Sequence, residues 1–414
     1  MKDNLLHTPE GVRDIYGEEC IIKERTENAI KNCIKKYGYE QIKTPTFEYF
    51  DIFNSERGTV SSRDMYKFID RDGETLVLRP DITPEVARCI AKYFCDETLP
   101  VRLFYEGNIF INNSGYMGKL KEFTQIGVEN VNSCGADADS EVIALMIDSL
   151  NAAGLNEFQV EIGNADFFRG ICAEAGFSDS ETAEMRDLIE TKNIFGVHEL
   201  LEEKNIDPEL KNILSDLPLE FGTIDFVKDI KSKIKNETAI SALDRILDVY
   251  EKLSAYGFES HVTVDLGMLT HYDYYTGIVF KAYTHKMGEA IAGGGRYDKL
   301  LSQFGKPAPA IGFAINTDYT ILALTRQNAV PDVMKNLTLI LYSKEFENKA
   351  IKVAKQLRAD GLPAATLLID ENVSEEKYED YAKKIMAGGI LYVDSADKIR
   401  LKDLYTKEIH EKDI

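Results

Sequence analysis

The sequence lacks any apolar run near the roughly 18 residues that a membrane-spanning helix requires, so no transmembrane span is expected. Its opening residues, MKDNLLHTPEG, also lack the apolar stretch of a secretory signal peptide. Both absences argue against membrane-embedded and secreted classes of protein. The sequence therefore predicts a cytoplasmic protein.

Common signatures of nucleotide and metal binding are missing as well. The chain contains neither the GxxxxGK[ST] pattern of a P-loop nor the GxGxxG pattern of a dinucleotide-binding fold. None of the six cysteines forms a CxxC pair, and no histidine stands at a metal-ligand spacing from them. We expect reduced thiols, no metal site and no cofactor.

Basic residues are too few to balance the acidic ones. The chain has 49 Lys and Arg against 70 Asp and Glu, which gives a formal net charge of −21 at pH 7. Such a surface repels phosphate backbones and anionic lipid at long range. The lysines near the C-terminus are interleaved with acids, as on a solvated helix face. We expect no nucleic-acid partner and no membrane partner.

The order of hydrophobic patterns predicts an α+β protein with two domains. Strand and helix patterns fill residues 1–326, except that a stretch at about 166–256 is helical throughout. A polar linker at 327–336 leads into alternating strand and helix patterns over 330–414. We therefore expect a mainly antiparallel sheet domain with a helical insertion, followed by a small C-terminal α/β domain.

Several local elements are also predicted from periodicity and turn residues. Residues 18–37 carry an amphipathic helix pattern, and Asp72-Gly73 favours the turn of a hairpin over 65–79. The remaining elements that matter below are strands at 101–111, 121–131 and 287–293 and helices at 82–95 and 295–304.

The segment LRPDIT at 78–83 ends a strand and begins a helix with a carboxylate and a hydroxyl. An N-cap role for Thr83 would explain its polar residues without any ligand, and on this segment alone that interpretation is favoured. The alternative is a ligand-binding turn.

The segment FTQIGVE at 123–129 reads as a strand in which alternate residues share one face. Gln125, Gly127 and Glu129 fall on that face, and the glycine leaves room for a ligand against the backbone. Glu129 could then pair with an ammonium group. A half-exposed strand with its polar side in solvent fits the same alternation equally well.

Two further segments combine aromatic residues or glycines with polar groups. YDYYTG at 272–277 could complete a polar pocket with its hydroxyls, or could be ordinary aromatic packing in a sheet. GGGRYD at 293–298 permits close approach of a ligand to the backbone, with Arg296 as a fixed cation at its edge. Its alternative is a strained turn leading into a helix.

In this order, and with TPEGVRD at 8–14, these segments resemble histidyl-tRNA synthetase and its paralogues over essentially the full chain. YDYYTG together with GGGRYD is typical of the histidine branch of the class II synthetases. The resemblance implies a class II antiparallel sheet, a helical insertion and a C-terminal domain like the anticodon-binding domain. It also implies a homodimer built through residues 18–50.

The resemblance carries a histidine pocket over to this chain. The implied histidine-binding residues are Asp81 (a glutamate in the synthetase), Thr83, Gln125, Glu129, Tyr274 and Tyr275. All of them are kept or conservatively changed.

The chain departs from the synthetase mainly at positions where the synthetase has arginine. Ile111, Tyr319 and Thr270 stand where the synthetase has the arginines that hold ATP and act on histidine, and Asn113 replaces a nearby acid. One such electrostatic contact is typically worth about 3–4 kcal/mol in a transition state. We therefore expect no catalytic residues, no adenylation and no ATP binding.

The histidine-binding residues are therefore kept, while the residues that hold ATP are lost. In this combination the chain resembles the regulatory subunits of ATP phosphoribosyltransferase in histidine biosynthesis. That resemblance implies a non-catalytic chain whose partner is the short catalytic subunit, with histidine as feedback effector. It further implies a homodimer within a hetero-octamer. The alternatives are a divergent histidyl-tRNA synthetase and a paralogue that binds another amino acid or a tRNA-like partner.

Overall fold

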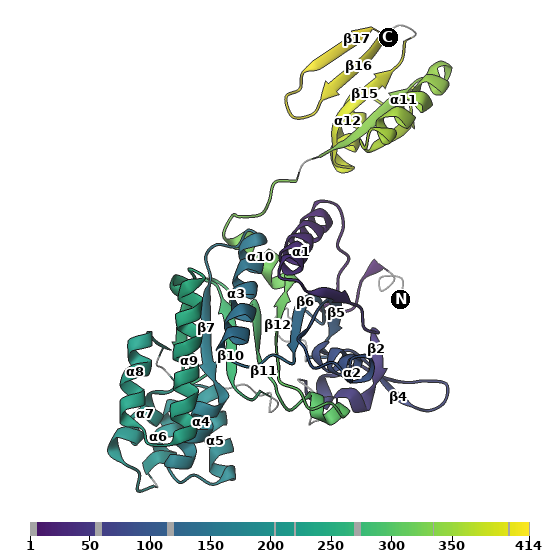
Figure 1. The fold of residues 1–414 in the computed structure, drawn as a ribbon. Coiled ribbons are helices and arrows are strands. Elements are labelled where there is room, and N and C mark those ends of the chain that lie inside the picture. The colour runs from purple at the N-terminus through teal and green to yellow at the C-terminus, as the bar shows by residue number, and fades with distance from the viewer. Residues whose placement is uncertain are drawn as a thin grey trace. The chain divides into compact units, whose positions relative to one another are not determined.

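The computed structural model describes residues 6–53, 60–113, 120–202, 204–218, 221–268, 275–333, 335–395 and 398–413 (Figure 1). The chain divides into two compact units. The first comprises Met1–Asp14 and Lys23–Val330, and the second comprises Ile15–Ile22 and Pro331–Ile414. Among the described helices, none is long and apolar enough to cross a membrane.

The first unit is built on a nine-stranded sheet in the order β1-β5-β6-β12-β11-β10-β7-β9-β8. Neighbours from β5 through to β7 are antiparallel, whereas β1 pairs with β5, and β7 with β9, in parallel. The expected mainly antiparallel sheet is therefore confirmed. The strands are β1 (Glu40–Ile42), β5 (Val101–Phe110), β6 (Glu122–Val131), β7 (Gln159–Asn164), β8 (Phe221–Gly222), β9 (Val262–Asp265), β10 (Ile278–Tyr283), β11 (Ala292–Arg296) and β12 (Ala310–Asn316).

Helices cover one face of this sheet because every second strand residue there is apolar. Ile126 and Val128 of β6 lie in one buried cluster with residues of α1 (Glu18–Lys36), α3 (Ala136–Ala152) and α9 (Glu237–Ala255). The intervening residues of the same strands face the other side. That other side is therefore free to be polar, and it carries the site described below.

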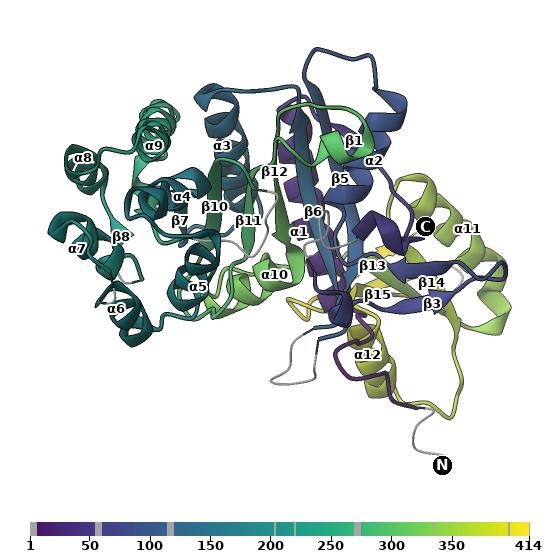
Figure 2. The same cartoon turned by 90° about the horizontal axis from the view of Figure 1, so that it is seen from below.

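The helical insertion runs between β7 and β9 and gathers at the β7 end of the sheet (Figure 1, Figure 2). It agrees with the helical pattern expected over about 166–256, except that the short β8 interrupts it and pairs with β9. Its helices are α4 (Ala165–Glu174), α5 (Asp179–Glu190), α6 (Ile194–Glu202), α7 (Pro208–Asp216), α8 (Ile224–Lys233) and α9.

A small three-stranded sheet in the order β2-β4-β3 precedes α2 (Thr83–Tyr93). Its strands are β2 (Phe47–Tyr49), β3 (Lys67–Ile69) and β4 (Thr75–Leu78). The predicted hairpin is confirmed: β3 and β4 are antiparallel, and Gly73 in the turn has a φ of 91°. That backbone conformation is one that glycine adopts readily.

The bounds predicted for the strand at 287–293 and the helix at 295–304 are wrong. The strand begins at Ala292 and contains all three glycines, and the expected helix is only a 3-10 turn at Leu301–Phe304. A Cβ on Gly294 would lie 2.1 Å from the carbonyl oxygen of Gly312 on the neighbouring strand. The glycines therefore serve close packing within the sheet, which no turn propensity could indicate.

The second unit is a five-stranded sheet in the order β14-β13-β15-β16-β17. Helices α11 (Glu347–Ala359) and α12 (Glu375–Lys384) pack on opposite faces, because Ile340 lies with α11 while Leu339 and Leu341 lie with α12. The sequence indicated β13 (Leu337–Tyr342), β14 (Ala364–Leu368) and β15 (Ala387–Val393), and the structure adds the antiparallel β16 (Lys398–Asp403) and β17 (Ile409–Asp413).

We expect Gly294→Ala to destabilise the first unit by about 1–3 kcal/mol, the usual range for overpacking. Its Cβ would meet backbone of β12, which cannot move without breaking strand pairing. The matched control is Gly288→Ala, where no atom lies within 4 Å of the new Cβ. Thermal or urea unfolding of both variants tests this, and equal stabilities would contradict it.

Candidate functional site

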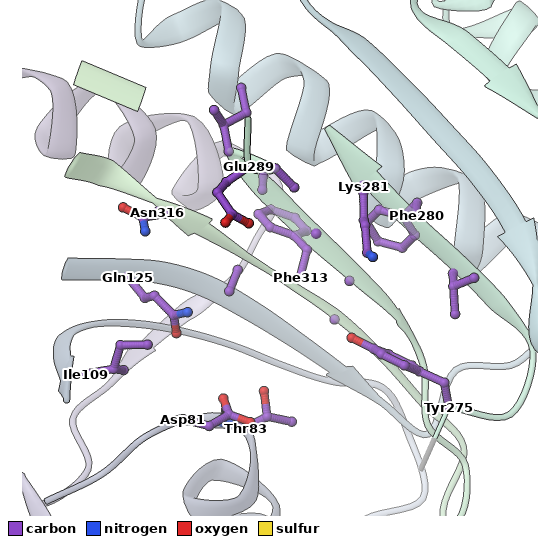
Figure 3. Close-up of a pocket in the computed structure, with 18 of the residues that line it drawn as sticks. Asp81, Thr83, Ile109, Gln125, Tyr275, Phe280, Lys281, Glu289, Phe313 and Asn316 are labelled. Atoms are coloured by element: carbon purple, nitrogen blue, oxygen red, sulfur yellow. Dashed lines mark hydrogen bonds between the residues drawn. The ribbon is translucent and has the colours of Figure 1, made fainter. Parts of the chain in front are cut away.

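A cavity of about 340 Å³ opens over the polar side of the first unit's sheet (Figure 3). Its walls come from the β4–α2 junction, from β5 and β6, and from β10 to β12. Of the six residues implied by the resemblance, the cavity is lined by Asp81, Thr83, Gln125, Glu129 and Tyr275. The sixth, Tyr274, lies outside the described residues, as does Thr270.

Two glycines in the sheet make room for side chains at and beside the cavity. A Cβ on Gly312 would lie 2.0 Å from Oε2 of Glu129, so the absence of that carbon gives the carboxylate its space. Gly127 has the same role beside Tyr105, whose hydroxyl would lie 2.3 Å from an added Cβ. The room predicted at Gly127 is thus taken up by Tyr105.

Glu129 is only 2% exposed, so the solvent-facing alternative for its strand does not describe it. The Thr83 hydroxyl donates to its Oε1 at 2.7 Å, and the Tyr297 hydroxyl donates to its Oε2. Burial raises the pKa of Glu129 to about 8, although both hydroxyl donors act to lower it. The group is a buried acceptor that would gain from a cationic or N–H-donating ligand.

At the β4–α2 junction, Asp81 binds the backbone of the first helical turn and Thr83 binds Glu129. Oδ1 of Asp81 accepts from the backbone N–H of Ile82 at 2.6 Å and of Thr83 at 3.2 Å. Ile82 occupies the N-cap and makes no side-chain capping bond. The N-cap role considered for Thr83 is therefore wrong, and its hydroxyl is available to orient Glu129.

Arg296 does not form the edge of this cavity, contrary to the sequence-based expectation. Its Nε and Nη2 donate to Oδ1 of Asp139 on α3, at 2.9 and 2.5 Å. Arg245 of α9 donates to the other oxygen of Asp139 at 2.8 Å. Asp139 is fully buried, so this ion-paired triad ties β11 to the covering helices.

Part of the cavity lining is apolar, and the described lining carries little positive charge. Ile109, Ile111 and Phe123 belong to the apolar part, and the Phe123 ring stacks on Tyr319 with centroids 6.3 Å apart and planes at 7°. Across the described lining, the carboxylates of Asp81, Glu129 and Glu289 face one cation, Lys281. This balance favours cationic ligand groups over phosphates.

Sequence reasoning missed Tyr297, Lys281 and Glu289 as lining residues. Tyr297 fell in a predicted helix that does not form. For Lys281, the only sequence signal was the alternation of strand residues, which places it on one face of β10. No cluster of His, Cys, Asp or Glu suited to a metal ion occurs within the described ranges.

Comparison with known proteins gives consistent matches. Residues 11–319 match the family model described as histidyl-tRNA synthetase. A protein of Acetivibrio thermocellus named ATP phosphoribosyltransferase regulatory subunit is 38% identical, over 98% of this chain and 96% of its own. A protein of Clostridium acetobutylicum with the same name is 36% identical, over 90% and 92%.

Two solved structures share the fold. One, described as an ATP phosphoribosyltransferase regulatory subunit/histidyl-tRNA synthetase from Bacillus halodurans, has a TM-score of 0.85 and 31% identity and covers 95% of this chain and 99% of its own. Histidyl-tRNA synthetase from Nostoc sp. PCC 7120 has a TM-score of 0.82 at 22% identity, covering 99% and 97%, which bears on the fold alone. The expected class II synthetase-like fold is confirmed.

We expect the stability of the wild type relative to Glu129→Gln to fall as pH rises from 4.5, the ordinary pKa of a glutamate, to about 8, the pKa of Glu129 in the folded protein. In that window the folded state holds a proton that the unfolded state has lost, so its free energy of unfolding decreases with pH. The glutamine variant lacks this proton. Melting temperatures across the range measure the difference, and Glu251→Gln on the exposed face of α9 is the control. A constant difference would contradict the raised pKa.

Proposed function

The chain belongs to the histidyl-tRNA synthetase family and, within it, to the ATP phosphoribosyltransferase regulatory subunits, and on that premise we propose that it is a non-catalytic regulatory subunit. It binds a short catalytic subunit in the cytoplasm, activates it and transmits feedback inhibition by histidine. The observation that carries this proposal is a cavity that brings together Asp81, Thr83, Gln125, Glu129 and Tyr275 and whose described lining contains a single cation, Lys281.

The amino-acid end supports histidine as the ligand. Asp81, Thr83, Gln125, Glu129 and Tyr275 converge on one cavity, as the resemblance implies for a histidine pocket. The Gln125 Oε1 is buried and has no hydrogen-bond partner, so it is available to an N–H group of a ligand. Glu129, held between two hydroxyl donors, offers a buried acceptor to an imidazole N–H or an ammonium.

The other end supports the loss of ATP binding. Ile111 and Tyr319 stand where the resemblance implies arginines, and the Tyr319 ring stacks on Phe123. Phosphates are usually held by Arg or Lys, and here they would also face the carboxylate of Glu289. We infer that the synthetase reaction is absent.

Feedback requires a difference in affinity. Histidine can inhibit only if it binds the inhibited assembly more tightly than the active one, and typical coupling of this kind is about 5- to 150-fold. The cavity joins β6, α2 and β10–β12 of one unit, so a bound ligand would restrain several elements together.

The small sheet supports the homodimer that we propose as the building block of a hetero-octamer. Phe47, Tyr49 and Phe68 lie on one face of it and are 53%, 56% and 39% exposed. Apolar side chains gathered in this way mark interaction surfaces. The second unit is proposed to be an anticodon-binding-like domain that no longer serves tRNA, because its lysines and arginines are interleaved with acidic residues.

We expect the chain to raise the phosphoribosyltransferase rate of a short catalytic subunit from the same organism, and histidine to suppress that rate. Glu129→Gln and Gln125→Ala should raise the histidine concentration for half-inhibition about tenfold or more, the usual effect of losing one hydrogen bond to a charged group. Steady-state rates across a histidine titration measure both effects.

Stimulation without histidine is measured for the same variants, so that lost assembly is separated from lost histidine binding. Glu251→Gln, which is remote from the cavity lining, serves as the control. Absence of any effect of the wild-type chain on the catalytic subunit would contradict the proposal.

The second candidate is a divergent histidyl-tRNA synthetase. Its C-terminal unit, Pro331–Ile414, does not favour it, because a regulatory-subunit relative matches 98% of this chain. We expect no histidine-dependent exchange between ATP and pyrophosphate above the blank. Exchange at a rate comparable with a synthetase run in parallel would establish this candidate instead.

A further inference from the structure

Lys281 is the single cationic side chain among the described residues that line the cavity. It stands on β10, paired in register with Gly293 of β11 on one side and with Glu161 of β7 on the other. Its side chain is half-buried, and Figure 3 shows it at the cavity wall formed by β10. The cavity therefore has a cation at a defined place.

The ammonium of Lys281 makes no hydrogen bond or ion pair within the part of the chain that the structure describes. Its ammonium interacts electrostatically with Glu161 and Asp265 but keeps its hydrogen-bond donors, which an anionic ligand group could use. The neighbouring carboxylates are Glu161 and Asp265 along the sheet and Glu289 at the cavity. Burial raises the pKa of Glu161 to about 7, while Lys281 acts to lower it.

Glycine at position 293 gives the Lys281 side chain its path. A Cβ on Gly293 would lie 3.4 Å from the Lys281 Cγ, so the lysine stem runs against the space above Gly293. Gly293 itself lines the cavity, as does Ala314 of β12, with which it is paired. The stem is thereby accommodated on the cavity side of the sheet.

We propose that Lys281 binds the carboxylate of the amino-acid ligand and thereby selects a zwitterion over the corresponding amine. This inference rests on the proposed histidine-binding function of the same cavity. A ligand carboxylate would enter beside Asp81, Glu129 and Glu289, and burying it there requires a cation. Lys281 supplies that cation, while the cationic and N–H groups of the ligand meet the carboxylates.

A purely structural role for Lys281 would be to offset the charge of Glu161 across the strands. If that is its only role, mutation of Lys281 lowers the stability of the protein and changes the affinity for every ligand by the same factor. Selection of the carboxylate predicts instead that the effect depends on whether the ligand has one. The two roles therefore separate in a cycle that changes both the protein and the ligand.

The experiment measures, by titration calorimetry on the full chain, the affinities of histidine and of histidinol, in which a hydroxymethyl group replaces the carboxylate. We expect the wild type to prefer histidine by about 10- to 100-fold, the range for one charge-assisted hydrogen bond. Lys281→Met should reduce that preference to near unity. Lys281→Arg should retain most of it, and Lys252→Met on the exposed surface of α9 should leave it unchanged.

The outcomes separate this inference from the function on which it rests. If the wild type binds neither ligand, the proposed histidine-binding function is overturned. If the wild type prefers histidine and folded Lys281→Met keeps that preference, or loses both affinities equally, the role of Lys281 is overturned. Should the methionine variant fail to fold, a Lys281→Arg variant that binds histidinol as tightly as histidine would overturn it equally.

Discussion

The burial of one carboxylate, that of Glu129, is the constraint on which the cavity depends. A carboxylate that is 2% exposed must be hydrogen-bonded, and here the donors are the hydroxyls of Thr83 and Tyr297. Those donors come from α2 and from the residue after β11, so satisfying Glu129 brings three parts of the unit together. Gly312 must lack a side chain for the carboxylate to fit.

A second buried carboxylate stabilises the opposite side of the same sheet. Asp139 is bonded by both Arg296 and Arg245, which links β11 with α3 and α9. The consecutive residues Arg296 and Tyr297 therefore serve opposite sides, one meeting the helices and the other the cavity.

The proposed function follows from which charges the cavity keeps. Its carboxylates suit the cationic and N–H groups of an amino acid, and Lys281 is placed for the group of opposite charge. Ile111 and the stacked rings of Phe123 and Tyr319 supply no cation that could hold a phosphate. Under the proposed function the site holds its ligand without converting it, and such a ligand can shift an equilibrium between assemblies.

The sequence by itself determined the alternation of β6, the hairpin at Gly73, the helical insertion and most of the α/β pattern of the second unit, since these depend on local periodicity and turn residues. It also indicated, through the resemblance, the cavity residues from Asp81 to Tyr275. Only the tertiary structure decided that the glycines at 293–295 belong to a strand, that Arg296 meets Asp139 157 residues away, and that Tyr297 meets Glu129 168 residues away. Such contacts arise from the order of strands in the sheet, and no local pattern records which distant residue a side chain will meet.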